Sequence, residues 1–350
     1  MQNQVKIDVY LFSKERNYYA NVEEARLRRN LKNGLELNDV KYINSPIDEN
    51  IKIVHFLNFE DYNKFNYFKN KTIIKAVSVL STESDSKGRL LNRVKNKETK
   101  EFEYHISKKD LNILNSFDYV LAPSEEAKKL LLNEGVVSKV EVLNPSVKLS
   151  KLKLDQTEIA NIVYIYFHFE ENSKYFLVPL DYTDAEAAKK VLNLASIFKN
   201  YRFIIYSQDL NLKEAKSVKK IFKKHPWNII IANNLEEDVY YSMLYRSSGV
   251  ILLNEVPLFL LELMEAFAAK KPVLALKNSV FQDMAIDKIN SHVYNDFASL
   301  IKGINELILG ELVDLSTNEY KFASENRIQV VGEKLVELYK RMLKEKENVW

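Results

Sequence analysis

Two glutamates near residue 250 follow a short apolar run of strand length, which is where ligand-binding residues of a parallel sheet are expected. Residues 249–253 are apolar, and Glu255 comes two residues later. A second apolar stretch carries Glu265 and ends at a Lys-Lys-Pro sequence, after which residues 272–276 are again apolar. Open parallel sheets bind ligands beside the carboxyl ends of their strands, where helix N-termini also attract anions. The spacing therefore predicts a strand, an acidic ligand site, a helix and a second strand.

Histidine is the other residue type that could transfer a proton. His55 stands at the end of the predicted strand 51–57, where its imidazole either faces a ligand as an acid or base or packs in the core with hydrogen-bond partners. The chain has no cysteine, which excludes disulfides, thiol nucleophiles and cysteine-bound metals. The other four histidines lack the spacing of a metal site: His105, His168, His225 and His292.

The pattern along the chain predicts the scaffold that positions these residues. Apolar runs of strand length alternate with amphipathic stretches of helix length, which is typical of βαβ units and parallel sheets. The first series has strands at 5–12, 51–57, 72–80, 119–122 and 139–143, and helices at 21–37, 106–116 and 124–133. The second series has strands at 162–169, 175–179, 201–206, 228–232, 249–253 and 272–276, and helices at 184–198, 212–224, 236–246, 258–269 and 297–309.

Two such series predict an α/β protein of two doubly wound Rossmann-like domains that face each other across a cleft. We expect the first domain at 1–148, a polar linker at 149–160 and the second domain at 161–318. The remaining residues, 319–350, are predicted to form one long helix that crosses back to the first domain.

The composition is that of an ordinary globular protein. The chain has 350 residues, of which 46% are hydrophobic and 28% charged, and its net charge is +3. No apolar run approaches the ~18–20 residues of a membrane span, and the start of the chain lacks a signal-peptide pattern. We therefore expect a cytoplasmic protein that does not bind nucleic acid. The basic segment 87–100 is either a solvated loop or a peripheral contact with an anionic surface, such as the inner face of the membrane.

Four segments carry a resemblance to a known family. They are 117–147, where a strand ending in Pro-Ser leads to a helix, a Gly-Val turn and a strand; 228–253; 265–275, with the sequence EAFAAKKPVLA; and the last helix, 327–343. Together they resemble the GT-B glycosyltransferases, specifically the family-4 type known as glycosyl transferases group 1. The resemblance is diffuse over nearly the whole chain and specific in these four segments.

The resemblance implies transfer of a hexose from a nucleotide-diphosphate sugar to a glycan, lipid or protein acceptor, without a metal or other cofactor. Glu265 matches the family's glutamate that binds the nucleotide ribose. The glutamate that lies near the transferred sugar should fall at position 257, where this chain has Pro257, so Glu255 is the candidate for that role. His55 is the candidate for the catalytic histidine of the acceptor domain.

The chain departs from the family where the diphosphate should bind. Leu180 and Ala185 stand where the family has an arginine and a lysine, which leaves Lys174 and Lys189 as candidate donor-binding cations. These departures leave open an alternative, a catalytically inactive GT-B homologue that forms a hetero-oligomer with an active glycosyltransferase. The aromatic segment 59–68 is then either a contact surface for that partner or a core helix.

Overall fold

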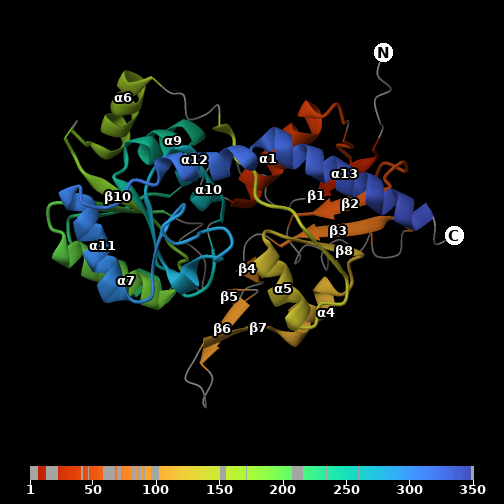
Figure 1. Ribbon diagram of the computed structural model, residues 1–350, viewed down its shortest axis with the longest axis horizontal. Coiled ribbons are helices and arrows are strands. Elements are labelled where there is room, and N and C mark those ends of the chain that lie inside the picture. Colours follow the sequence, from red (N-terminus) through yellow and green to blue (C-terminus); the bar gives the residue numbers. More distant parts are fainter. Residues whose placement is uncertain are drawn as a thin grey trace. The chain divides into compact units, whose positions relative to one another are not determined.

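The computed structural model divides the chain into two compact units (Figure 1). Unit 1 comprises residues 1–17, 24–146 and 326–350, and unit 2 comprises residues 18–23 and 147–325. The sequence predicts that the first domain ends at residue 148 and the second at residue 318. The structure describes residues 7–12, 23–40, 42–45, 47–57, 68, 72–79, 83–84, 88–89, 91–95, 102–149, 155–170, 172–206, 216–233, 235–258 and 260–347. Of the aromatic segment 59–68, only Phe68 lies within the described residues, and it is buried.

Unit 1 is built on a parallel sheet with the strand order β1-β2-β3-β8-β9. These strands are β1 (Val9–Phe12), β2 (Ile53–Phe56), β3 (Ile74–Ser78), β8 (Tyr119–Ala122) and β9 (Lys139–Val142). Its helices are α1 (Glu23–Leu37), α4 (Lys108–Leu114), α5 (Glu125–Asn133) and α13 (Ile328–Glu347). Two antiparallel pairs join β4 (Glu83–Ser84) to β5 (Gly88–Arg89) and β6 (Leu91–Lys95) to β7 (Phe102–Ile106).

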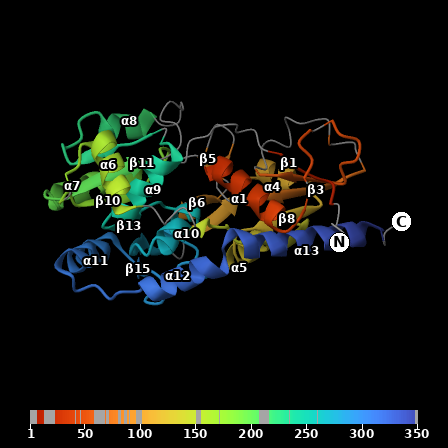
Figure 2. The same ribbon diagram turned by 90° about the horizontal axis from the view of Figure 1, so that it is seen from above.

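Helix α13 closes unit 1 by packing closely on α1, which comes some 300 residues earlier in the chain (Figure 2). Gly332 lies directly against Gly34, and a Cβ atom at position 332 would stand 2.5 Å from the Gly34 carbonyl oxygen. Two helix backbones approach this closely only where both carry glycine, because any side chain would separate them. Leu335 and Tyr339 of the same helix are buried in the core.

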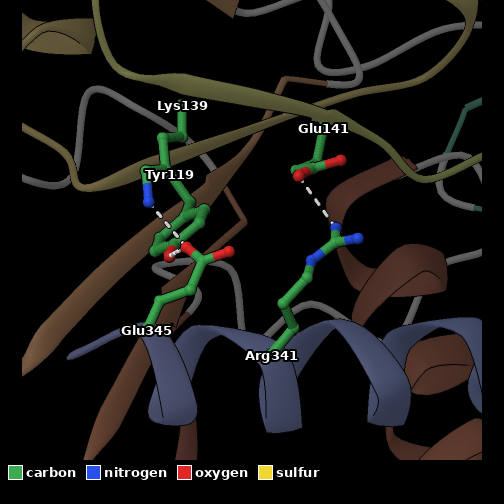
Figure 3. Close-up of polar contacts among 5 residues, drawn as sticks. All are labelled: Tyr119, Lys139, Glu141, Arg341 and Glu345. Atoms are coloured by element: carbon green, nitrogen blue, oxygen red, sulfur yellow. Dashed lines mark hydrogen bonds and ion pairs between the residues drawn. The ribbon is translucent and has the colours of Figure 1, made fainter. Parts of the chain in front are cut away.

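Polar contacts fix the other end of α13 on the strands β8 and β9 (Figure 3). The Glu345 carboxylate accepts hydrogen bonds from the Tyr119 hydroxyl at 2.5 Å and the Lys139 ammonium at 2.6 Å. One turn earlier, Arg341 pairs with Glu141 at 2.8 Å. Burial and, to a smaller extent, the neighbouring Glu345 carboxylate raise the pKa of Tyr119, so its hydroxyl remains a donor.

Unit 2 contains a six-stranded parallel sheet with the order β12-β11-β10-β13-β14-β15. The strands are β10 (Tyr175–Pro179), β11 (Arg202–Tyr206), β12 (Ile229–Ile231), β13 (Gly249–Leu252), β14 (Val273–Leu276) and β15 (His292–Tyr294). The helices are α6 (Gln156–Phe167), α7 (Ala185–Ile197), α8 (Lys216–Phe222), α9 (Glu237–Arg246), α10 (Leu260–Ala268), α11 (Phe297–Leu309) and α12 (Ser316–Glu325). Helices α7, α8 and α11 share one apolar core on the sheet, whereas α6 packs on α9 and α12 packs on α10.

Several sequence expectations were wrong. Residues 162–169, expected as a strand, lie mostly in α6, which also takes in the end of the expected linker 149–160. Asp155 caps that helix by accepting from the backbone N–H groups of Thr157 and Glu158. The single last helix is two helices, α12 and α13. Part of the basic segment 87–100 forms β6, which pairs with β7, and strand β15 had not been expected. Within the described ranges, no helix is both long and apolar enough to cross a membrane.

Candidate functional site

The sheet of unit 2 reverses its direction of growth between β10 and β13. These two strands are neighbours in the sheet although three helices and two strands separate them in the chain. The loops after them, 180–184 and 254–258, therefore leave the same carboxyl edge side by side. Such a switch point is where open α/β sheets leave room for a ligand. The candidate site is built here.

Asp184 joins the two loops with one buried carboxylate. Its Oδ1 accepts the backbone N–H of Ala187 at 2.9 Å and so caps the N-terminus of α7. Its Oδ2 accepts the backbone N–H of Glu255 at 2.9 Å, across the switch point. The loop that carries Glu255 is thereby fixed to the start of α7, with Glu255 itself only half-buried.

Asn254 presents a buried donor at the same place. Its side-chain oxygen accepts the backbone N–H of Asp181 at 3.3 Å, and the residue is 1% exposed. Its Nδ2 atom has no hydrogen-bond partner among the described residues. Buried polar groups are nearly always paired in folded proteins, so this unpaired amide is a candidate donor to a ligand oxygen. Sequence reasoning missed Asn254, although it lies directly beside Glu255.

Glu265 lies on α10 and is almost completely buried. Two tyrosines of α9 bind it: the Tyr240 hydroxyl donates to Oε2 at 2.7 Å, and the Tyr241 hydroxyl donates to Oε1 at 3.1 Å. These contacts join α9 to α10 across 25 and 24 positions of the chain, which no local pattern in the sequence predicts.

The candidate cations are distributed over both ends of the sheet. Lys174 precedes β10 and lies at the amino edge, where its ammonium stands 5.8 Å from the ring centre of Tyr201. Lys189 lies near the start of α7 but is exposed and pairs with Glu186 at 2.6 Å. Loop 180–184 holds no cation, as the sequence indicated. Lys277, which sequence reasoning did not single out, follows β14 at the carboxyl edge and is exposed.

His55 lies in unit 1, inside β2, and has no exposed surface. Its Nδ1 atom is 2.6 Å from the Tyr339 hydroxyl and its Nε2 atom is 2.8 Å from the Ser78 hydroxyl. Burial lowers the pKa of His55 to about 3, so the ring is neutral at physiological pH. The structure matches the alternative in which the His55 imidazole packs in the core with hydrogen-bond partners. A catalytic role for His55 stays an untested prediction.

In the part of the chain that the structure describes, no group of three or more histidine, aspartate or glutamate side chains could hold a metal ion. The carboxylates at the switch point instead bind backbone N–H groups. Their arrangement can position loops and accept hydroxyl hydrogen bonds from a ligand.

Solved structures superpose on nearly the whole chain. A glycosyltransferase from Rickettsia africae gives a TM-score of 0.66 at 15% identity and covers 97% of this chain and 98% of that one. The Anabaena protein Alr3699/HepE, solved in complex with UDP-glucose, gives a TM-score of 0.66 at 12% identity over 96% and 99% of the two chains. The expected GT-B fold with Rossmann-like domains is therefore confirmed.

One curated protein is similar in sequence. The processive diacylglycerol alpha-glucosyltransferase of Acholeplasma laidlawii is 21% identical over 248 residues, which are 67% of this chain and 70% of that protein. No protein-family model matches the chain.

Proposed function

We propose that this chain, which has the GT-B fold, is a glycosyltransferase that moves a hexose from a nucleotide-diphosphate sugar to an acceptor. The observation that carries the proposal is the switch point of unit 2, where the unpartnered amide of Asn254 and the carboxylate of Glu255 lie at the edge that binds ligands in open sheets. A structure with the same fold was solved with UDP-glucose, which makes UDP the first nucleotide to test.

The two loops at the switch point serve the sugar end of the donor. The Asn254 Nδ2 group donates to a sugar or phosphate oxygen, and Glu255 accepts sugar hydroxyls. Asp184 does not touch the donor in this proposal; it holds the backbone of Glu255 in place. Positioning of this kind lowers the barrier to transfer because less ordering is needed when the sugar binds.

The Glu265 carboxylate serves the nucleotide end by binding the ribose. A carboxylate suits a vicinal diol because its two oxygens accept two hydroxyl groups at once. The charge of the leaving diphosphate is met by Lys277 at the carboxyl edge, with Lys189 near the start of α7, in place of the missing arginine and lysine.

The acceptor is proposed to be a membrane lipid. The support is the curated relative, whose name gives diacylglycerol as its acceptor. A lipid acceptor would bring the chain to the inner face of the membrane as a peripheral protein. The measurement is transfer of radiolabelled glucose from UDP-glucose to diacylglycerol in vesicles, with a soluble glucan as the comparison acceptor.

Titration calorimetry with UDP and GDP tests the donor site directly. Glu265→Gln removes the charge and is expected to weaken UDP binding at least about tenfold. Lys277→Gln is expected to weaken it about fivefold to tenfold. Lys174→Gln is the matched control, because it removes the same charge from the opposite edge of the sheet and should leave the affinity unchanged.

Two results would count against the proposal. If the wild-type chain binds neither nucleotide, a non-catalytic role as partner of another glycosyltransferase replaces it, and co-purification with such an enzyme becomes the measurement. If Lys174→Gln weakens UDP binding as much as Lys277→Gln does, the assignment of the carboxyl edge is wrong.

A further inference from the structure

The amino edge of the unit 2 sheet carries a surface that the proposed donor site does not use. Strands β12, β11 and β10 are parallel neighbours, so the segments before them meet at one edge, opposite the donor site. Backbone hydrogen bonds join these segments. The Arg202 N–H group donates to the Lys174 carbonyl at 3.0 Å, and the Phe203 N–H group donates to the Asn228 carbonyl at 2.8 Å. We call the three segments, 172–174, 198–202 and 223–228, the amino-edge surface.

Buried hydrogen bonds hold this surface in one shape. The Asn228 side chain is 1% exposed, and its Nδ2 group donates to the carbonyls of Ala195 at 2.9 Å and Tyr201 at 3.0 Å. The end of the third segment is thereby fixed to the turn that forms the second. A surface that is ordered before binding loses less conformational freedom when a partner docks.

The amino-edge surface is strongly basic. It contains no aspartate or glutamate, and the nearest described carboxylate along the chain is that of Glu170. Its cations make no ion pair within the described ranges. By contrast, the loops 180–184 and 254–258 at the carboxyl edge carry three acidic residues and no cation. The amino edge therefore attracts anions. Its cations are Lys174, Lys199, Arg202, Lys223 and Lys224, and all but Arg202 are exposed.

Arg202 gives the surface a fixed binding geometry. Its guanidinium carbon lies 4.4 Å from the ring centre of Phe169 and 5.9 Å from that of Trp227. Its Nη1 atom donates to the Ser173 hydroxyl at 2.8 Å, which is the only hydrogen bond of its side chain among the described residues. A guanidinium carries five N–H donors in a rigid plane. Held in this way, Arg202 offers the remaining donors to a carboxylate or phosphate in a bidentate contact.

Aromatic side chains border the cations. Trp227 is 69% exposed, although it directly precedes the buried Asn228. The last turns of α6, which lead to Phe169, also expose Tyr164 and Tyr166. Tryptophan, tyrosine and arginine are the residue types that contribute most of the binding energy in protein interfaces. The amino-edge surface thus combines charge with apolar contact area.

An anionic lipid surface and an acidic protein segment both match this chemistry, and the position of the surface separates them. The proposed lipid acceptor must reach the donor site at the carboxyl edge. A membrane on the opposite edge would hold that site away from the lipid. A protein segment docked at the amino edge leaves the donor site open, so the observations favour a protein.

We infer that the amino-edge surface docks an acidic segment of a partner protein. One carboxylate of that segment binds the Arg202 guanidinium, further carboxylates pair with the lysines, and an apolar side chain packs on the exposed Trp227 ring. This inference goes beyond the proposed function, because docking needs neither a nucleotide nor an acceptor. Only the choice of a protein over a lipid rests on the proposed function.

Fluorescence polarisation of a labelled peptide tests the surface on the full chain. The probe is a short peptide of aspartate, glutamate and one phenylalanine, and its counterpart has asparagine and glutamine at the acidic positions. The wild type is expected to bind only the acidic peptide, and the affinity should fall as sodium chloride is added, because salt screens exposed charges. Arg202→Gln should weaken binding about tenfold. Arg202→Lys keeps the charge but loses the planar donors, so it should weaken binding at least about threefold. Trp227→Ala should weaken it about threefold.

Lys216→Gln is the matched control. Lys216 is an exposed cation at the start of α8, whereas Lys223 and Lys224 follow the end of the same helix. The control should keep the wild-type affinity, while Lys223→Gln combined with Lys224→Gln should weaken binding about fivefold. Because both of these lysines are exposed, the double variant tests the surface even if Arg202→Gln fails to fold.

Any of three results would overturn the inference. Equal binding of the acidic and amide peptides by the wild type would show that the surface does not recognise carboxylates. A loss in Lys216→Gln as large as that in the double variant would show that general charge, rather than this surface, attracts the peptide. Vesicles of phosphatidylglycerol that bind the wild type but not Arg202→Gln, with no binding of the peptide, would assign the surface to lipid.

Titration with UDP on the same samples keeps the two proposals apart. All of these variants are expected to bind UDP as the wild type does, because the changed side chains lie away from the donor site. A wild-type chain that binds the acidic peptide but neither UDP nor GDP would overturn the proposed function alone.

Discussion

Two buried polar side chains, one in each unit, differ in how completely they are hydrogen-bonded. In unit 1, both ring nitrogens of the buried His55 have partners on β3 and α13. In unit 2, Asn254 is equally buried, yet its Nδ2 atom has no partner among the described residues. A satisfied buried group helps to select one packing, whereas an unsatisfied one costs stability and is expected mainly where a ligand completes it. His55 is therefore held by contacts within unit 1, whereas Asn254 is the position in unit 2 where we proposed that a ligand completes a buried group.

The largest expected effect comes from breaking the packing that closes unit 1. Gly332→Val places side-chain atoms where the backbone of Gly34 lies 2.5 Å from the added Cβ. We expect a loss of about 3 kcal/mol or more in the free energy of unfolding, because α1 and α13 must separate. Urea denaturation followed by circular dichroism measures the loss.

Hydrogen exchange then shows whether the loss is confined to unit 1. Peptides from α1 and α13 should exchange faster, while peptides from β10 and β13 should not change. Lys334→Val is the control, since that position of α13 is exposed. Equal losses in the two variants would mean that the contact between the glycines contributes little.

The next largest effect is a pH dependence of unit 2 that arises from Glu319 on α12. Burial, with a smaller contribution from the Asp314 charge, raises the pKa of Glu319 to about 8. The folded unit holds this proton between pH 4.5 and 8 while the unfolded chain releases it, so stability falls as pH rises through this window. Glu319→Gln is expected to remove about 3 kcal/mol of the difference in unfolding free energy between pH 5 and pH 8.

His55 makes the stability of unit 1 change with pH in the opposite direction, so it serves as the internal comparison for Glu319. Burial lowers the pKa of His55 to about 3. Between pH 6.5 and 3, the imidazole therefore binds a proton in the unfolded chain but stays neutral in the folded unit. Stability in unit 1 should therefore fall as pH drops from 6.5 toward 3. Hydrogen exchange in β2 and in α12, followed across both windows, should show opposite trends. Parallel trends would contradict the assignment of these two groups.

The smallest expected effect concerns the exposed polar contacts of α13. Glu345→Ala removes an ion pair whose side chains are 37% and 62% exposed, so we expect a loss below about 1 kcal/mol. The loss should shrink in high salt. A double-mutant cycle with Lys139→Ala measures the coupling energy. A coupling of more than about 2 kcal/mol would show that ion pairs, rather than the contact between the glycines, hold α13 in place.

The sequence predicted the scaffold better than the site. Strands 119–122 and 175–179 and helix 297–309 were placed at their observed bounds, because hydrophobic period, caps and turns are local signals. Residues 156–167 were misassigned because their Ile, Val, Tyr and Phe content favours strands, while packing on α9 and the Asp155 cap make them a helix. Local propensity is a weak guide where tertiary contacts decide.

The contacts that build the site were not predictable, because they join residues far apart in the chain. Asp184 meets Glu255 across 71 positions, and Tyr240 meets Glu265 across 25. Glu255 and Glu265 were found from their places after an apolar strand and within the following helix, and the family resemblance supplied their donor roles, which remain to be tested. The resemblance could not reveal Asn254 or the tyrosine pair, because these depend on how two loops and two helices meet in space.

Because the chain is synthesised from its N-terminus, the division into two units affects when unit 1 can finish folding. In the sequence, unit 1 is formed by residues that come before and after most of unit 2, and α13 is the last of its helices to be synthesised. All of unit 2 therefore leaves the ribosome before α13 can cover α1. Until then, the face of α1 around Gly34 lacks its partner, and such exposed surface favours aggregation during folding. The nascent chain is thus expected to need chaperone protection for unit 1 for longer than for unit 2.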